Sequence, residues 1–206
     1  MKRIILGLMF LCLCSTVAFA ETNNDADTYK YQGDSKYHSK DYTGAIEDYT
    51  KAIEADPEHS WAYDNRGLAK YKLKDYTGAI EDHTKAIELK PEARTYCNRA
   101  LAKKELKNYT GAIEDYTKAI ALNPEDAKNY INRGLAKNKL KDYTGAIEDF
   151  NKAIELSPKY AYAYYERGEA KYALKDKKGA LKDLRKAGEL GHPFASDKIK
   201  QYKLEK

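Results

Sequence analysis

The sequence predicts an all-α protein, a solenoid of tandem helix–turn–helix repeats. The segment KDYTGAIEDYTKAIE at residues 40–54 recurs from Lys74, Lys107 and Lys141, and in weaker form from Lys175. Each copy is preceded by another helix-forming segment and a turn. The alanine after the repeated glycine recurs at steps of 34, 33, 34 and 34 residues, at Ala45, Ala79, Ala112, Ala146 and Ala180. A period of this length is typical of stacked supersecondary units.

Residues 1–20 have the pattern of a secretion signal. Two basic residues at positions 2 and 3 precede an apolar run over 4–13, and Ala18 and Ala20 provide the small residues that a signal peptidase requires. The run is shorter than the roughly 20 residues of a membrane-spanning helix. We therefore expect cleavage after Ala20, export to the periplasm or the extracellular space, and no stable membrane span in the mature chain.

The cysteines leave two alternatives open. Cys12 and Cys14 lie where a lipoprotein signal would place its acylated cysteine, but leucine precedes each of them, where such signals carry a small residue. Cleavage after Ala20 would leave Cys97 as the only cysteine, which excludes an internal disulfide. Cys97 is interpreted as a helix-face residue, with a reactive or intermolecular thiol as the alternative.

Composition excludes one class of partner. Charged residues make up 33% of the 206 residues, and the net charge is +5. It falls to +3 without residues 1–20, whose only charged residues are Lys2 and Arg3. Acidic and basic residues alternate within every repeat and form no basic stripe. The pattern therefore argues against nucleic-acid binding.

Residues 60–91 illustrate the expected repeat. The proline-free segment over 60–74 is expected to form the first helix, and Asp75 or Thr77 caps a second helix that ends at Pro91. Neither helix can bury its apolar stripe alone, so the pairs must stack. After a flexible lead-in over 21–26, we place five repeats over 27–193, at 27–59, 60–92, 93–125, 127–159 and 161–193.

Residues 194–206 are expected to form a capping helix. Ala195, Ile199 and Tyr202 fall on one face at i, i+4 and i+7, backed by Phe194, whereas the lysines of this segment, Lys198 among them, face water. Such a helix closes the apolar end of a repeat stack and keeps it soluble.

Six columns recur through the repeats: an aromatic residue, a small residue four positions later, an alanine, a mostly aromatic position, a second alanine and a proline. They are Tyr29, Tyr63, Tyr96, Tyr130 and Tyr164; Gly33, Gly67, Ala100, Gly134 and Gly168; the five alanines named above; Tyr49, His83, Tyr116, Phe150 and Leu184; Ala52, Ala86, Ala119, Ala153 and Ala187; and Pro57, Pro91, Pro124 and Pro158. This pattern resembles the tetratricopeptide repeat (TPR). The resemblance implies a right-handed superhelix whose concave face is lined by the first helix of each pair.

Two columns depart from the family pattern, with charged or polar residues where it has leucine and tyrosine. They are Gln32, Arg66, Arg99, Arg133 and Arg167, and Lys36, Lys70, Lys103, Lys137 and Lys171. We expect their aliphatic stems to pack and their charged groups to reach solvent.

No arrangement of residues predicts catalysis, and we expect no enzyme activity, no metal and no cofactor. The four histidines lack metal-ligand spacing, and neither a nucleophile elbow nor a phosphate-binding glycine loop is present. Adjacent acidic residues recur in the second helices, at Glu47–Asp48, Glu81–Asp82, Glu114–Asp115 and Glu148–Asp149. Because neighbours on a helix diverge by about 100°, these pairs are interpreted as a solvated face.

Function is therefore expected on the concave face, where the columns vary between repeats. By analogy with the family, the partner-binding residues are Trp61, Asp64, Leu68, Tyr71, Arg94, Leu101, Lys104, Lys128, Ile131, Leu135, Tyr162 and Tyr165, with Asn138 and Glu169 in the same columns. Aromatic side chains beside arginine are typical anchors of a protein interface. The sequence thus predicts a non-catalytic scaffold that binds a protein or peptide segment. The alternative is a binder of a non-protein envelope ligand such as a glycan, which the nineteen tyrosines would serve. Homo-oligomerisation is left open.

Overall fold

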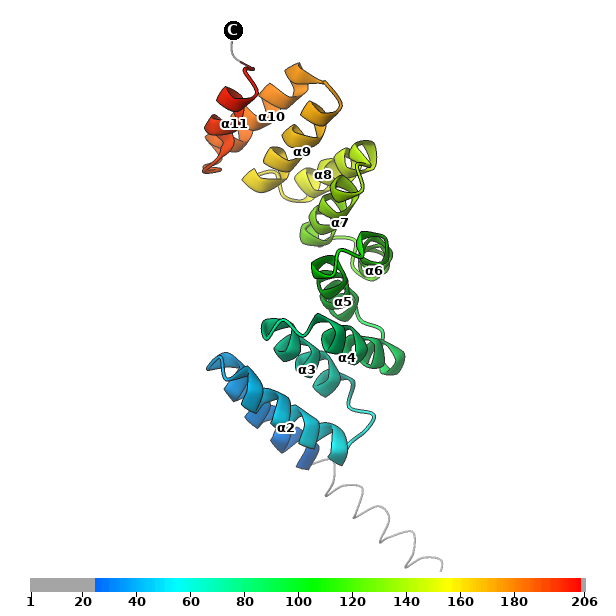
Figure 1. Ribbon diagram of the computed structural model, residues 1–206. Helices are drawn as coiled ribbons and strands as arrows, with labels where there is room; N and C mark the ends of the chain where they lie inside the picture. Colours follow the sequence, from blue (N-terminus) through cyan, green and yellow to red (C-terminus); the bar gives the residue numbers. More distant parts are fainter. Residues whose placement is uncertain (1–24, 205–206) are drawn as a thin grey trace, which may run out of the picture. The chain divides into compact units, whose positions relative to one another are not determined.

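The computed structural model describes residues 25–204 (Figure 1). The predicted signal segment, the cleavage at Ala20 and most of the lead-in lie outside the described residues. Over residues 25–204, all regular secondary structure is helical, and the fold is an all-α solenoid of paired antiparallel helices. None of the helices in this range is long and apolar enough to cross a membrane.

The chain divides into two compact units between Pro91 and Glu92. The first contains the helical residues 25–38 and three further helices, α2 (Tyr42–Ala55), α3 (Ser60–Lys72) and α4 (Tyr76–Leu89). The second contains α5 (Ala93–Glu105), α6 (Tyr109–Leu122), α7 (Ala127–Lys139), α8 (Tyr143–Leu156), α9 (Ala161–Ala173), α10 (Lys177–Glu189) and α11 (Ala195–Gln201). The boundary lies in the one 33-residue step of the repeat.

The turn inside each repeat has one geometry throughout. The second helix begins after an aspartate or asparagine whose side chain accepts a hydrogen bond from the backbone N–H of the repeated glycine, at 2.9–3.0 Å. In the second repeat this residue is Asp75, so Asp75 rather than Thr77 is the N-cap. The preceding residue is always a lysine with positive φ, between 60° and 66°, at Lys40, Lys74, Lys107, Lys141 and Lys175.

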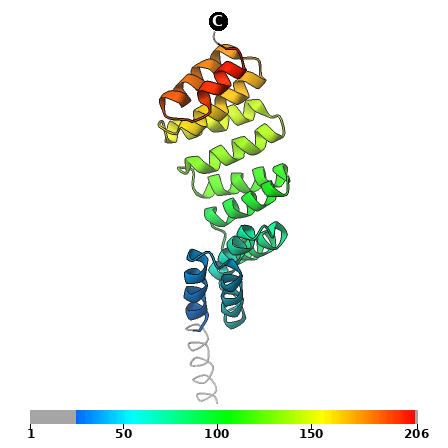
Figure 2. The same cartoon turned by 60° about the vertical axis from the view of Figure 1, so that its left-hand side comes forward.

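Small residues let the two helices of a repeat approach closely. Figure 2 shows successive pairs stacked in the second unit, where α5 packs on α6, α7 on α8, and α9 on α10. The core of each repeat holds fully buried alanines and one large residue of the second helix, namely Tyr49, His83, Tyr116, Phe150 or Leu184. A Cβ added at Gly134 would lie 2.8 Å from the Phe150 ring, so a glycine is needed at this crossing.

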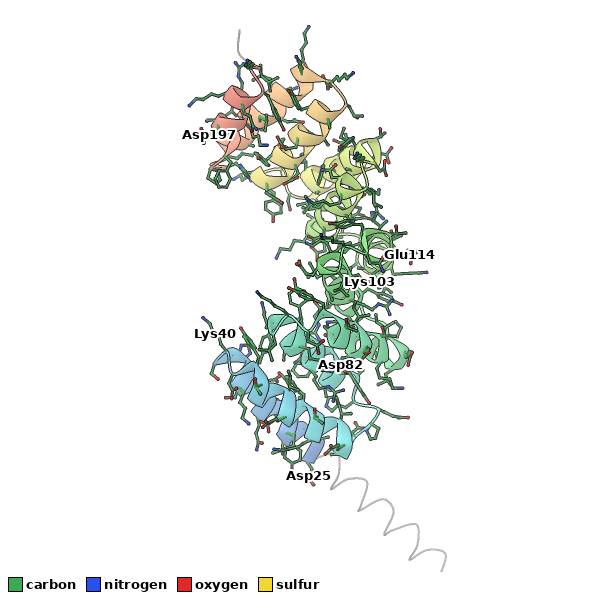
Figure 3. The ribbon with its side chains drawn as sticks, in the orientation of Figure 1. Asp25, Lys40, Asp82, Lys103, Glu114 and Asp197 are labelled. Atoms are coloured by element: carbon green, nitrogen blue, oxygen red, sulfur yellow. The ribbon has the colours of Figure 1, made fainter. Side chains whose placement is uncertain are left out.

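The acidic pairs of the second helices divide into an exposed and a buried residue. The glutamates are exposed as predicted, but the aspartates are at most 4% exposed, so the prediction of a wholly solvated face was wrong. The buried residues are Asp48, Asp82, Asp115, Asp149 and the equivalent Asp183. Asp82 of α4 is labelled in Figure 3. A buried carboxylate needs a charged or hydrogen-bonding partner.

The partners of the buried aspartates are the arginines and lysines that were expected to reach solvent. In the fourth repeat, Asp149 lies 2.6 Å from Nη2 of Arg133 and 2.9 Å from Nζ of Lys137. The same arginine–lysine–aspartate cluster recurs in the second, third and fifth repeats. We call it the ion triad. The expectation that these arginines and lysines extend into water is thus corrected, because the aspartate draws their charged groups inward.

The arginine of the triad also bridges to the preceding repeat. Nη1 of Arg133 lies 3.1 Å from the Thr117 hydroxyl, and the guanidinium stands 5.7 Å from the Tyr130 ring centre. The first repeat has Gln32 at this position, and there Lys36 and Lys51 hold the buried Asp48 at 2.7 and 3.2 Å. Charged residues therefore fasten helices together where the family pattern has apolar ones.

The capping helix α11 is shorter than predicted. Ala195 and Ile199 are buried as expected, but Phe194 is 63% exposed and does not support the apolar face. Lys198 does not point away from the stack, because its Nζ pairs with Glu169 of α9 at 2.9 Å. The cap is thus held by an ion pair as well as by apolar contact.

Candidate partner-binding groove

The second unit contains an open pocket of about 740 Å³ on the side formed by the first helices of its repeats. It is lined by the C-terminal part of α5, by α7 and α9, by the N-termini of α6 and α8, and by Tyr202 after α11. We call it the α5–α7–α9 groove. Four of the predicted partner-binding residues meet there, Lys104, Leu135, Tyr162 and Tyr165, together with Asn138 and Glu169.

Nine other lining residues were not predicted as binding residues, and four of them have polar side chains that bear on recognition: Glu166, Tyr109, Tyr143 and Tyr202. Glu166 stands in a column that holds asparagine in the second, third and fourth repeats, and this change was a signal available in the sequence. Tyr109 and Tyr143 belong to the turn column and were assigned to packing alone. Tyr202 was assigned to the cap, and its position in the groove follows only from how α11 packs on α10.

The remaining predicted residues of the second unit lie outside this pocket. Arg94 and Lys128 are exposed, and Leu101 is half-buried. Ile131 is only 3% exposed and packs in the apolar cluster around Phe150. Its burial corrects the expectation that Ile131 offers surface to a partner, because the neighbouring helices already cover it.

In the first unit, the structure separates Asp64 from the other predicted residues. Asp64 is 1% exposed, and its Oδ1 lies 2.8 Å from Nδ1 of the buried His83. Its carboxylate therefore holds α3 to α4 and is unavailable to a partner, contrary to the prediction. Trp61, Leu68 and Tyr71 are half-buried, and Trp61 lines a smaller pocket of about 420 Å³. The Nζ of Lys30 stands 4.7 Å from the Trp61 ring centre.

The α9 wall of the groove carries two carboxylates one helical turn apart. Oε2 of Glu169 accepts a hydrogen bond from the Tyr202 hydroxyl at 3.0 Å and faces Lys198 at 2.9 Å. Burial raises the pKa of Glu166, and the charge of Glu169 raises it further, whereas hydrogen bonding to Tyr162 and the charges of Lys139 and Lys198 act in the opposite direction.

Aromatic rings are stacked at the end of the groove nearest the cap. The rings of Tyr172 and Tyr202 are stacked with centres 3.5 Å apart, and those of Tyr165 and His192 with centres 4.0 Å apart. The pKa of Tyr202 is raised to about 12, mainly by burial and to a smaller extent by the hydrogen bond to Glu169. These contacts hold Tyr165 and Tyr202 in fixed orientations, which lowers the entropy cost of using them in binding.

The groove offers binding surface and no reactive arrangement. Among residues 25–204, no three histidine, cysteine, aspartate or glutamate side chains are grouped so that they could hold a metal ion. Burial raises the pKa of the Cys97 thiol to about 11, which disfavours the thiolate at neutral pH. What the groove can provide is hydrogen bonds, charge and aromatic area.

Three models of the tetratricopeptide repeat match the chain, over residues 33–74 and 136–175, residues 62–92, and residues 93–126. Together these ranges cover more than half of the sequence. The chain belongs to the tetratricopeptide-repeat family. This TPR protein is accordingly a protein–protein interaction scaffold, of a family that is generally non-catalytic.

Solved structures of similar fold agree with this assignment. The chain is similar to the protein MamA, with 28% identity, a TM-score of 0.76, and coverage of 88% of this chain and 97% of MamA. It shares its fold with YrrB, described as a TPR protein with an unusual peptide-binding site, at 22% identity, a TM-score of 0.77 and coverage of 90% and 97%. It also shares its fold with PilF of Pseudomonas aeruginosa, at 22% identity, a TM-score of 0.72, and coverage of 83% of this chain and 78% of PilF. A search of curated proteins finds no match.

Proposed function

We propose that this TPR protein is exported and holds a segment of a partner protein in the α5–α7–α9 groove. The observation that supports the proposal most directly is that Lys104, Leu135, Tyr162 and Tyr165, chosen from repeat columns, line one pocket of about 740 Å³. A pocket of that size accommodates several side chains of a peptide.

The chemistry of the lining suits an extended or helical peptide. Leu135 and the tyrosines provide apolar area, while carboxylates on α9 and lysines on α5 and α7 provide polar anchors. Interfaces commonly combine aromatic anchors with a polar rim in this way. The fold likeness to YrrB, for which a peptide-binding site is described, is consistent with this use of the groove.

Site-specific photocrosslinking tests the proposed surface. A photoreactive amino acid replaces Ala173, which is exposed and lines the groove, and in a control protein it replaces Glu148, an exposed residue of α8 outside the groove. We expect a protein adduct at position 173 and none at position 148. We also expect the adduct at 173 to disappear when Leu135→Ala and Tyr162→Ala are introduced into a variant whose circular dichroism spectrum is unchanged.

Two results would contradict the proposal. Equal adducts at both positions, or an adduct that survives the Leu135→Ala and Tyr162→Ala substitutions, would show that a different surface binds the partner. An adduct made of carbohydrate, with no protein, would favour the glycan alternative. Neither result depends on where in the cell the protein resides.

Export is tested separately by mass spectrometry of the mature protein recovered from each cell fraction. A chain that begins at Glu21 in the periplasm or the medium supports export with cleavage after Ala20. A chain that begins at an acylated Cys14 would establish the lipoprotein instead, and an intact Met1 in the cytoplasm would refute export.

A further inference from the structure

Two residues that line the α5–α7–α9 groove each have a buried side-chain oxygen atom that accepts no hydrogen bond from residues 25–204. The two atoms are Oδ1 of Asn138, on α7, and Oε1 of Glu169, on α9. Buried acceptors are almost always paired, because leaving one unpaired costs about 1–3 kcal/mol. Two such residues in one pocket, on two different helices, favour a ligand that is rich in hydrogen-bond donors.

The charge on α9 specifies that this ligand is a cation. Glu166 and Glu169 lie at i and i+3 and therefore share one face of the helix. Lys198 and Tyr202 occupy Oε2 of Glu169 only. Burial and the neighbouring Glu169 raise the pKa of Glu166, and Tyr162, Lys139 and Lys198 offset this rise only in part. A second cation would offset the remainder.

Aromatic rings surround the same two carboxylates. Tyr162, Tyr165 and Tyr202 line the pocket with them. A guanidinium is planar, has five N–H donors, stacks on aromatic rings and binds carboxylates through two hydrogen bonds, whereas an ammonium is a compact and strongly hydrated charge. Acceptors on two helices together with tyrosine rings therefore favour arginine over lysine.

The other wall of the groove defines the rest of the ligand. Lys104 and Lys107, from α5 and the turn after it, and Lys139, at the end of α7, line the pocket, with Glu105 as the acid nearest to them in the chain. These lysines would repel a uniformly basic peptide. The ligand should therefore place its cation against α9 and carry an acidic residue toward α5 and the end of α7.

We propose that the α9 wall of the groove binds an arginine side chain of the partner segment, through Glu166, Glu169 and Asn138. The inference rests on the proposed peptide-binding function and makes it more specific. The bound segment is one in which an acidic residue lies near this arginine.

The probe is a library of random nine-residue peptides displayed on phage and selected against the full-length protein. We expect selected peptides to carry arginine at a fixed position. In a synthetic selected peptide, replacing this arginine by citrulline, which keeps the shape and removes the charge, should weaken binding at least tenfold, and lysine should weaken it as well. Glu166→Gln and Asn138→Ala proteins should bind the arginine and citrulline peptides nearly equally.

Glu148→Gln is the matched control, because it removes the same charge from an exposed residue outside the groove. It should retain the preference for arginine over citrulline. Asn138→Ala should also leave the melting temperature almost unchanged, since the part of the chain that the structure describes provides no partner for its Oδ1. A fall in melting temperature that explains the loss of binding would assign Asn138 a structural role and overturn its part in recognition.

The possible failures are distinguishable. If selected peptides require Leu135 and Tyr162 but show no preference for arginine over citrulline or lysine, the arginine site is refuted and the proposed function stands. If the folded protein selects no peptide that depends on the groove residues, both proposals are refuted.

Discussion

The guanidinium of Arg133 and the carboxylate of Asp149 meet through two pairs of atoms, with Nη2 2.6 Å from Oδ1 and Nε 3.0 Å from Oδ2. The arginine is on α7 and the aspartate on α8, so this contact joins the two helices of one repeat. Lys137 adds a third group at 2.9 Å. Because the carboxylate is 4% exposed, its solvation by water has been replaced almost entirely by these partners.

Removing one member of this triad should be costly. Asp149→Ala leaves two partly buried cations without their counter-ion, and we expect it to reduce the free energy of unfolding by about 3 kcal/mol. Urea denaturation followed by circular dichroism measures the change. Glu148→Ala, at the adjacent exposed position, should change stability by less than about 0.5 kcal/mol. Similar effects at both positions would mean that the triad contributes no more than a surface ion pair.

Replacing the whole triad should cost less than removing the aspartate. The triple variant Arg133→Met, Lys137→Met and Asp149→Leu exchanges charged groups for apolar groups of similar size, and such exchanges are often neutral. We expect it to be more stable than Asp149→Ala. A triple variant as unstable as Asp149→Ala would show that the geometry of the ion triad, and not merely the filling of its space, holds the repeat together.

A second prediction concerns the contact between Gly134 and Phe150. Gly134→Ala would place a Cβ 2.8 Å from the ring, so the helices must separate, at a cost of about 1–3 kcal/mol. Adding Phe150→Leu to Gly134→Ala replaces the ring by a smaller side chain and should restore part of the lost stability. A thermal denaturation double-mutant cycle tests this coupling. Purely additive effects would rule out a direct clash.

A third prediction concerns the lysines with positive φ. Lys141 has φ of 63°, a region that glycine occupies without the steric cost of a Cβ. Lys141→Gly should therefore raise the free energy of unfolding by up to about 1 kcal/mol, since the relief of strain is partly offset by the entropy of glycine in the unfolded chain. Chemical denaturation should show the opposite sign for Lys118→Gly, in the interior of α6, at about 1 kcal/mol.

A fourth prediction separates stability from binding at Glu166. Its pKa is raised in the folded protein above the ordinary 4.5, so between 4.5 and the raised value the native state binds more protons than the unfolded state. Stability therefore falls as pH rises through this window. Glu166→Gln should raise the melting temperature at pH 7, and this advantage should disappear below pH 4.

One outcome of this pH series would contradict the prediction. An advantage of Glu166→Gln that is the same at pH 3 and pH 7 would exclude ionisation as its cause. Glu105→Gln provides a control at an exposed residue that lines the same groove. If Glu166→Gln both stabilises the protein and abolishes arginine binding, then Glu166 lowers the stability of the fold in exchange for recognition of the ligand.

The repeat architecture was predictable because its determinants are local and are written several times. The alanine columns and the turn follow from spacing alone, whereas the sequence left Asp75 and Thr77 as alternative N-caps and the structure selects Asp75. The groove was only partly predictable. Lys104, Leu135, Tyr162 and Tyr165 were found because they belong to one column set, whereas Tyr202 enters the groove from a non-repeated segment whose packing no periodicity reports.

The burial of the aspartates was not predicted for a different reason. Helical periodicity places Asp149 beside Glu148 on a polar arc, and hydrophobicity alone does not say which of the two meets another helix. A signal was present in the spacing: in four repeats an arginine before the small residue is followed by an aspartate sixteen positions later, as Arg133 is by Asp149. Neither the arginine column nor the aspartate column indicates this pairing by itself.

The ion triad has a consequence for how such a chain can evolve. Each of the four triads draws its arginine, lysine and aspartate from a single repeat, so each of these buried aspartates finds its counter-ions within its own repeat. Duplication or loss of a whole 34-residue cassette keeps every triad intact. A genetic crossover between α7 and α8 would instead separate Arg133 from Asp149 and leave a buried charge without its counter-ion. The repeat is therefore the natural unit of recombination.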